Sequence, residues 1–241
     1  MTELLLDNDL RASNDGDEVR SIARTRTLTV LRELDGECRG QVLQFLYELN
    51  LISGNRPIID MSFADLREID LPYAKLENVT LPKVNLRKAN LYMAKLKGAN
   101  FDAADLDEAD LGWADLRNTN LHCGLSRANL GVAKLDGASL YGANLNGACL
   151  INASLVGTDL RYANFKYRNE SLGEAENENI ERANLALADM SYCNLTGAMI
   201  DPSQLASVKS LTGAIMPDEI KFEEWRESIK GSLGSAQTFE S

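Results

Sequence analysis

Large apolar residues recur along this chain every five residues, a spacing that matches the period of neither an α-helix nor a β-strand. In KANLYMAKLKGANFDAADLDEADLGWADL, residues 88–116, every fifth position from residue 91 is Leu or Phe. Ala stands two residues before each of them, and polar residues occupy most places between. The pattern therefore predicts a short repeated unit that is neither helix nor ordinary strand.

The repeat extends well beyond this stretch. Its large residues fall every fifth position over 66–121, over 125–165 after a one-residue slip in LHCGL, and over 180–200 after an interruption. Of these 26 centres, 21 are Leu, and 18 have Ala two residues earlier. Asp or Asn usually stands directly before the centre, so the unit reads A-(D/N)-L-x-x.

Each preference has a physical cause. A large and a small apolar residue at fixed spacing fill an interior together. Asn, Asp and Gly favour turns because they tolerate left-handed backbone or bond their own main chain. A turn every five residues closes a square coil after four units, and coils of this kind stack at about 4.8 Å. The pattern predicts an all-β solenoid of six to seven coils, roughly 30 Å long.

With this motif, the chain resembles the pentapeptide repeat family over about 57–205. The resemblance implies a right-handed quadrilateral β-helix. The preceding RTRTLTVLRELDGECRGQVLQFLYELNLI also resembles the helical extension of cyanobacterial members. Some members of the family bind a type II topoisomerase as DNA mimics.

The N-terminal part precedes the repeat. We expect residues 1–16 to be disordered and 17–54 to form a helical domain, with helices over 17–34 and 38–50 and Gly36 as the C-terminal cap of the first helix. The open end of a stacked column exposes unpaired backbone, so this hairpin is expected to cover the first coil. A separate docking module is the alternative.

The other end also has helical signals. Asp201 and Pro202 are typical of an N-cap and a first helical residue. Farther on, Phe222, Trp225 and Ile229 share one face of a helix expected from about Pro217. We therefore expect 206–241 to form a C-terminal capping helix and a flexible tail. The segment KYRNESLGEAENEN, residues 166–179, lacks the inward pairs and is expected to leave the column as a loop.

One side of the predicted column carries a strip of outward apolar residues. Residues 20 apart should stack, which places Tyr73, Met93 and Trp113 in one column that Val132 continues after the slip. Tyr92 and Ile151 belong to the same side. A contiguous apolar strip indicates a protein-contact surface, unless the 166–179 loop or a terminal segment covers it.

Charge limits the possible functions. The net charge of −11 and pI of about 4.7 argue against direct nucleic-acid binding, which needs a basic surface. The densest run of acidic residues extends from Asp102 to Asp115. Part of it is expected to pair with cations one coil away, since Arg87 should stack with Asp107 and Lys95 with Asp115. A third column is expected to hold Glu68, Lys88 and Glu108. The densest acidic patch is thus not a free anionic stripe.

The sequence offers little catalytic chemistry. His122 is the single histidine, Cys123 occupies an inward small-residue position, and the four cysteines form no CxxC pair. We therefore expect no cofactor, no metal site and no enzyme. The N-terminus has no basic region typical of a signal peptide, and no apolar run is long enough for a membrane span, so a cytoplasmic protein is expected.

Three functions follow, in decreasing order of support. The first is a rigid scaffold that binds a protein partner of unknown identity. The second is a DNA-mimicking modulator of a type II topoisomerase such as gyrase. The third is an enzyme or metal-binding protein. Gyrase-protecting family members dimerise through an exposed apolar last coil, and a helix over that coil would oppose such contact, so a monomer is expected.

Overall fold

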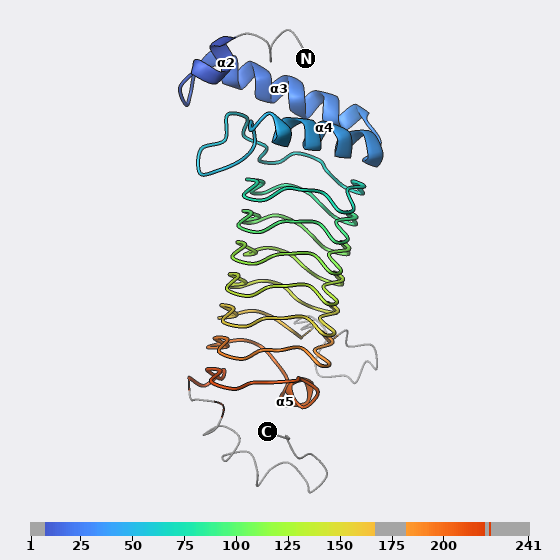
Figure 1. Cartoon of the computed structure of the whole chain (residues 1–241), viewed down its shortest axis with the longest axis vertical. Helices are drawn as coiled ribbons and strands as arrows, with labels where there is room; N and C mark the ends of the chain where they lie inside the picture. Colours follow the sequence, from blue (N-terminus) through green and yellow to red (C-terminus); the bar gives the residue numbers. More distant parts are fainter. Residues whose placement is uncertain (1–7, 167–181, 220–221, 223–241) are drawn as a thin grey trace, which may run out of the picture.

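The computed structural model describes residues 8–166, 182–219 and 222. It shows a long column of stacked coils with two helices lying across one end (Figure 1). The helices are α2 (Asn8–Ala12), α3 (Glu18–Glu33), α4 (Gly36–Glu48) and α5 (Pro202–Leu205). The first three precede the column, and α5 lies near its opposite end.

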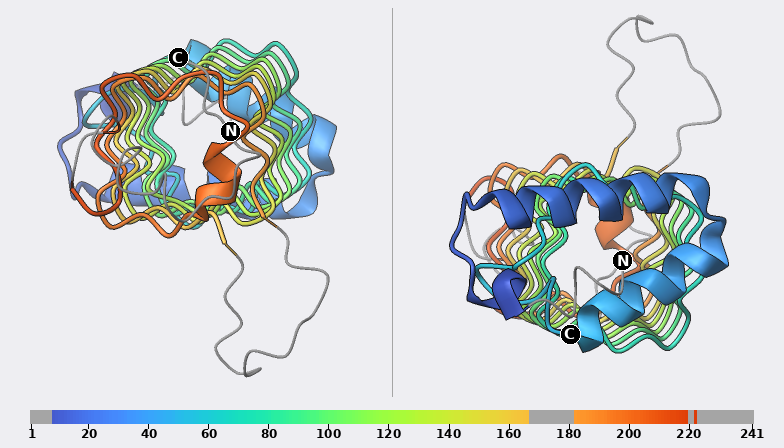
Figure 2. Two further views of the ribbon diagram at one scale, coloured as in Figure 1. Left: turned by 90° about the horizontal axis from the view of Figure 1, so that it is seen from below. Right: turned by 90° about the horizontal axis from the view of Figure 1, so that it is seen from above.

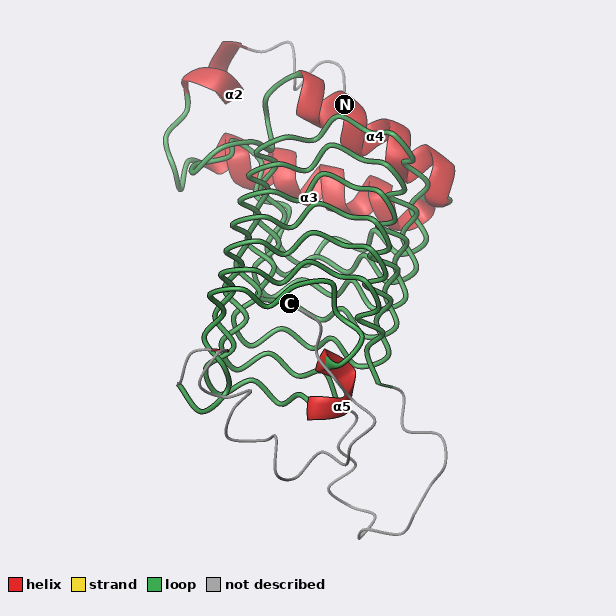
Figure 3. Ribbon diagram, turned by 60° about the horizontal axis from the view of Figure 1, so that its bottom comes forward, coloured by secondary structure: helices red, strands yellow, loops and turns green. Residues whose placement is uncertain are grey.

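Backbone pairing between successive coils gives the column its repeat. Parallel bridges join residues 20 apart, such as Asp65 with Asn85 and Asn85 with Asp105. Bridges recur every five residues, one on each side of a four-sided coil (Figure 2). Each bridge is isolated, so the described part of the chain contains no continuous strand (Figure 3). The predicted β-solenoid is confirmed, although single bridges stand where an all-β fold ordinarily has strands.

The register between coils changes at three places. It shortens by one residue at the LHCGL slip, lengthens by 15 after Phe165, and lengthens by one at α5. The bridged pairs that record these changes are Asp105 with Gly124, Cys149 with Asn184, and Asp189 with Ser210. The predicted loop at 166–179 lies outside the described residues except for Lys166. The Ala183 N–H donates to the Phe165 carbonyl at 3.2 Å, so the chain rejoins the column beside its point of departure.

Most sides of a coil turn at the second residue after the apolar centre, which has positive φ. Met93 and Trp113, with φ of 56° and 60°, are examples. This conformation costs a non-glycine residue about 1–2 kcal/mol. The Asx side chain before the centre supports the turn: Asn90 accepts the Tyr92 N–H at 3.2 Å, and Asp110 accepts the Gly112 N–H at 3.0 Å. The Asp/Asn preference of the repeat therefore has a structural cause.

Leu and Ala fill the interior. Ala94, Leu96 and Leu111 are 0% exposed, and Phe101 is 1% exposed. Each coil buries its large residues against those of the coils above and below, so no coil has a core of its own. Stability depends on the stack as a whole.

Helices α3 and α4 cover the first coil (Figure 2). In the column, Asn90 N–H donates to Ile69 in the preceding coil; for Asp70, which has no preceding coil, the acceptor is Gly36 at 3.3 Å. Likewise the exposed carbonyls of Arg67 and Glu77 accept from the side chains of Arg39 at 2.9 Å and Tyr47 at 3.2 Å. The helical hairpin thus replaces the hydrogen bonds that a preceding coil would supply.

Two expectations for the N-terminal region are wrong. Disorder was expected over 1–16, but Asn8–Ala12 forms α2, because Leu10 is buried against the core at 1% exposure; residues 1–7 lie outside the described residues. Gly36 begins α4 instead of ending α3, since the Asp35 side chain accepts the Cys38 N–H and caps α4.

The column also continues past its predicted end at residue 205. Asp201 and Pro202 do begin a helix, with a capping box between Asp201 and Gln204, but α5 has only four residues. A further coil follows it, in which Leu211 and Met216 are buried. The expected helix with Phe222, Trp225 and Ile229 lies mainly outside the described residues. Phe222 is partly buried, and its N–H donates to the Ala214 carbonyl at 3.0 Å.

Candidate protein-contact face

One side of the column is uncharged from its first coil to its sixth. We call it the apolar face and define it by the two outward residues after each centre. These are Pro72 and Tyr73, Tyr92 and Met93, Gly112 and Trp113, Gly131 and Val132, Ile151 and Asn152, and Ala186 and Leu187. The side that precedes it in each coil carries charges at the same places, including Arg67, Glu68, Arg87, Lys88, Asp107, Glu108 and Arg127. The repeat itself therefore does not require an uncharged side.

The backbone stacks the sequence-predicted residues directly above one another. Tyr73 N–H donates to Tyr92 O at 2.8 Å, and Val132 N–H donates to Ile151 O at 2.9 Å. Between them, Met93 and Trp113 donate to the carbonyls of Gly112 and Gly131, each at 2.8 Å. All six predicted contact residues, Tyr73, Tyr92, Met93, Trp113, Val132 and Ile151, thus lie on one side of the column.

These side chains are accessible in the described structure. Tyr73 is 63% exposed, Trp113 55% and Met93 40%. Tyr92 is half-buried and meets Tyr73 edge to face, with ring centroids 6.0 Å apart. Val132 and Ile151 are also half-buried. A contiguous strip of exposed apolar side chains is typical of a contact site.

Leu187 extends the face by one coil, and sequence reasoning missed it. It has φ of 58° and is 58% exposed, and the Asn152 N–H donates to the adjacent Ala186 carbonyl at 3.0 Å. Stacking residues 20 apart did not reach it, because after Phe165 the residues of successive coils that stack are 35 apart in sequence. Counting from the resumed centre at Leu185 would have located it.

The two borders of the apolar face differ. On one border an Asx ladder links coils: Asn90 donates to Asp70 at 2.6 Å and Asn129 donates to Asp110 at 2.9 Å. The other border carries lysines, and those in the first, second and fourth coils are exposed: Lys75, Lys95 and Lys134. The face is therefore bounded on one side by carboxylates that accept hydrogen bonds from asparagine amides, and on the other by three exposed lysines together with Asp115 and Asp189.

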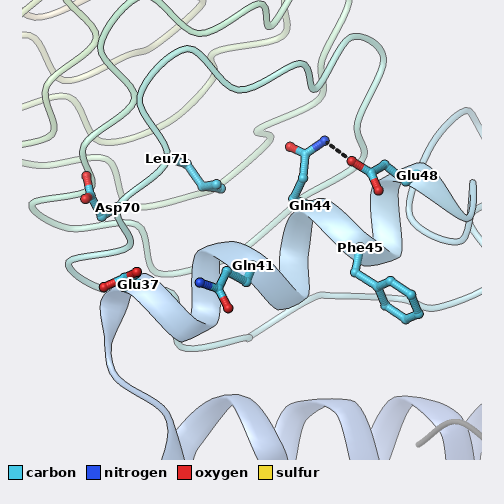
Figure 4. A pocket seen from close by; sticks show the side chains of 7 residues that line it. All are labelled: Glu37, Gln41, Gln44, Phe45, Glu48, Asp70 and Leu71. Carbon is cyan, nitrogen blue, oxygen red and sulfur yellow. Dashed lines mark hydrogen bonds between the residues drawn. The ribbon is translucent and has the colours of Figure 1, made fainter.

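A groove adjoins the face at its capped end (Figure 4). It has a volume of about 480 Å³ and lies between the outer side of α4 and the first coil, lined by Glu37, Gln41, Gln44, Phe45, Glu48, Asp70 and Leu71. Phe45 is 44% exposed, and Gln44 donates to Glu48 at 3.0 Å. Since Leu71 and Tyr73 belong to the same side of one coil, the groove continues the apolar face onto the cap.

Several acidic residues on the neighbouring side form ion pairs. Arg87 contacts Asp107 at 3.2 Å and Glu108 at 3.0 Å. Lys88 lies 3.8 Å from Glu108. The Arg87–Asp107 and Lys88–Glu108 pairs follow the predicted columns, whereas Arg87–Glu108 crosses between two of them. Burial raises the pKa of Asp107 above its ordinary 3.8.

Asp115 differs in detail from the expectation. Lys95 bridges to it through the backbone, as the register predicted, but its ion-pair partner is Arg117 at 2.6 Å. Hydrogen bonding from that guanidinium holds the pKa of the Asp115 carboxyl below 3.8. Short-range Arg–Asp pairing within one turn therefore adds to the pairing between coils.

The remaining candidates for chemistry lie apart from one another. Cys123 and Cys193 are buried, and burial raises the pKa of the Cys193 thiol to about 12 and that of Cys123 still further. Cys38 and Cys149 are half-buried. His122 is exposed, 3.4 Å from Asp102. No group of metal-ligating side chains occurs among the described residues. None of the described helices is long and apolar enough to span a membrane.

Comparison with known proteins identifies the repeat. The family model for pentapeptide repeats matches in 8 copies, at residues 59–92, 85–122 and 123–161. A structure of QnrB1, a plasmid-mediated fluoroquinolone resistance protein, has a TM-score of 0.52 at 18% identity over 73% of this chain and 84% of that chain, and this likeness shows the fold alone.

Two further solved structures are pentapeptide repeat proteins. Rfr23 from the cyanobacterium Cyanothece 51142 is 25% identical, covering 59% of this chain and 90% of that chain, with a TM-score of 0.38. A protein of the Arabidopsis thaliana thylakoid lumen is 33% identical, covering 46% of this chain and 70% of that chain, with a TM-score of 0.19. No curated protein matches the sequence.

Proposed function

Because the chain belongs to the pentapeptide repeat family, we propose that it is a non-enzymatic scaffold that binds a protein partner through the apolar face. The observation that carries this proposal is the uncharged side of six coils on a chain in which 25% of residues are charged. Exposed Tyr, Trp and Met side chains are the residue types enriched at protein interfaces. A rigid column holds them at fixed spacing, so little ordering entropy opposes binding.

The same proposal includes the state and place of the protein. We propose that it acts as a right-handed quadrilateral β-helix, as a monomer in the cytoplasm, without cofactor, metal, membrane or nucleic acid. The interior supports a role without catalysis, because packed Leu and Ala side chains fill the space that a substrate would need. Sedimentation at micromolar concentration tests the monomer: a species of twice 26.5 kDa would contradict it.

The test of the contact face is a comparison of partners captured from a native lysate. Wild type is compared with a Met93→Glu, Trp113→Glu double variant. A matched control places Glu at two exposed positive-φ positions on other sides, Phe63 and Tyr192, which are 69% and 66% exposed. Circular dichroism confirms that all variants are folded.

The proposal expects proteins that bind wild type and the Phe63→Glu, Tyr192→Glu control but not the Met93→Glu, Trp113→Glu variant. Surface changes of this kind alter stability by roughly 0.5 kcal/mol or less, so loss of binding would not reflect unfolding. Equal capture by all three proteins would contradict the assignment of the apolar face. The search would then move to the helical hairpin.

A second candidate is binding to a type II topoisomerase in place of DNA. The net charge of −11 and a fold shared with QnrB1 favour it. The pairing of Asp107, Glu108 and Asp115 with arginines opposes it, because those carboxylates do not form a free phosphate-like row. Gyrase supercoiling that is neither inhibited nor protected from a quinolone at micromolar protein would eliminate this candidate.

A further inference from the structure

The backbone N–H groups at the turns of the apolar face are already used within the column. They point along the column: Tyr73, Met93 and Trp113 all donate to carbonyls of the next coil. Peptides that add to a sheet need an unpaired edge, which a side of a closed coil lacks. A segment bound here must therefore satisfy its own backbone and be recognised through side chains. An α-helix does both.

The spacing of the face suits a helix that lies along the column. Its side chains repeat once per coil, at about 4.8 Å. An amphipathic helix presents an apolar residue every 3.5 residues on average, which corresponds to about 5 Å along its axis. From the first coil to the sixth the face extends about 24 Å, the length of roughly 16 helical residues. One helix of ordinary length would cover it.

The borders determine which charges that helix needs. Lys75, Lys95 and Lys134 are exposed along one border, and none of them forms an ion pair with a residue in the described part of the chain. Asp115 stands among them in the third coil, but Arg117 already holds its carboxylate. On the opposite border, the carboxylates of Asp70 and Asp110 accept from Asn90 and Asn129. These neutral amides leave both carboxylates charged, so the lysine border is the side of the face that offers cations to a partner.

We infer that the apolar face receives an amphipathic helix of a partner protein, about 16 residues long, with an apolar stripe and carboxylates along one border. The apolar stripe packs on Tyr73, Met93, Trp113 and Leu187. The carboxylates meet Lys75, Lys95 and Lys134. This inference rests on the proposed function and names the chemistry of the partner that the face selects.

A random library of 16-residue peptides, selected against the full-length protein, tests the inference. Selected peptides are expected to be rich in Asp and Glu on one flank of an apolar stripe, and to become helical on binding, as measured by circular dichroism. They are expected to bind a Lys75→Glu, Lys95→Glu, Lys134→Glu variant at least tenfold more weakly than wild type. Control peptides have the same composition in scrambled order.

A matched control variant changes one lysine on each of the other three sides: Lys83→Glu, Lys88→Glu and Lys97→Glu. It has the same net charge as the test variant, so a general effect of charge would weaken binding to both equally. The inference expects the control variant to bind like wild type, and equal weakening of both variants would overturn it. The corresponding Lys→Gln triple variant repeats the comparison with a smaller change of charge.

The outcomes separate this inference from the proposed function. Peptides that lose binding to the Met93→Glu, Trp113→Glu variant but not to the lysine variant would overturn the acidic helix and leave the contact face intact. Peptides that bind without forming a helix, or that are rich in Lys and Arg, would also overturn the inference. Binding that neither variant affects would overturn both, and so would a selection that yields no peptide for the apolar face.

Discussion

Replacing Gly40 of the helical cap by Ala combines two effects on stability that have opposite signs, helix propensity and steric contact. Gly40 lies within α4, where Ala would raise helix propensity by about 1 kcal/mol. A Cβ at this position would stand 2.7 Å from the Asp70 carbonyl oxygen and 3.1 Å from the Leu71 side chain. Because the nearer contact is backbone, Gly40→Ala forces α4 away from the first coil.

The expected size follows from the contacts that this shift disturbs. Overpacking of this kind costs about 1–3 kcal/mol. Lifting α4 also lengthens the bonds that cap Asp70 N–H and the Arg67 carbonyl, each worth about 1 kcal/mol. After the gain in propensity is subtracted, the cap should be destabilised by about 1–3 kcal/mol.

Hydrogen–deuterium exchange locates this effect. Each coil contacts only its neighbours, so peptides from residues 61–80 should exchange about 5- to 150-fold faster, while those from residues 111–135 should not change. Gln41→Ala, on the exposed outer side of the same helix, is the matched control and should leave both regions as in wild type. Slower exchange over residues 61–80 in Gly40→Ala would refute the reasoning, since it would mean that helix propensity outweighs contact with the first coil.

Three further predictions concern the column. Leu111→Ala removes a side chain that is 0% exposed, and should lower the free energy of unfolding by about 2–5 kcal/mol in urea denaturation; a loss below about 1 kcal/mol would mean that neighbouring coils collapse into the cavity. The Cys123 and Cys193 thiols, whose pKa values are raised by burial, should resist alkylation at pH 8 until the protein is unfolded, as mass spectrometry can measure; rapid labelling of the native protein would show that the core opens. Arg117 lowers the pKa of Asp115, so this pair should stabilise the fold above about pH 4, and its contribution should be lost as pH falls through the lowered pKa. An Asp115→Asn variant should therefore lose less stability between pH 5 and pH 2 than wild type. Equal losses would contradict the pairing.

The interior of the column was predictable because each of its positions obeys one local rule. Leu111 and Ala94 occupy repeat places whose inward direction follows from the five-residue period alone. The stacking of Tyr73, Met93 and Trp113 was equally accessible, because a constant 20-residue coil converts sequence spacing directly into position. Sequence reasoning succeeds here where contacts are local in three dimensions and periodic in sequence.

It failed where the period is interrupted. The four-residue helix at Pro202–Leu205 adds one residue to a coil, and the helical start signal at Asp201 and Pro202 was taken for the end of the column. The start signal was correct, but the helix has only four residues and ends where Leu205 is buried in the core, which no local rule expresses. Leu10 and the groove beside Phe45 were missed for a similar reason, because both arise from a helix packed against residues distant in sequence.

The side chains of the apolar face are not explained by the fold that carries them. Trp113 and Met93 occupy positive-φ places that disfavour them by about 1–2 kcal/mol relative to Gly. On the following side of the column the corresponding places hold Gly98, Gly137 and Gly157, so the coil accepts the unstrained residue. Bulky apolar residues at strained, exposed positions contribute little to the buried core. They occupy this place in the first four coils and in the sixth, with Asn152 in the fifth. We therefore attribute them to what the face contacts, and not to the stability of the column.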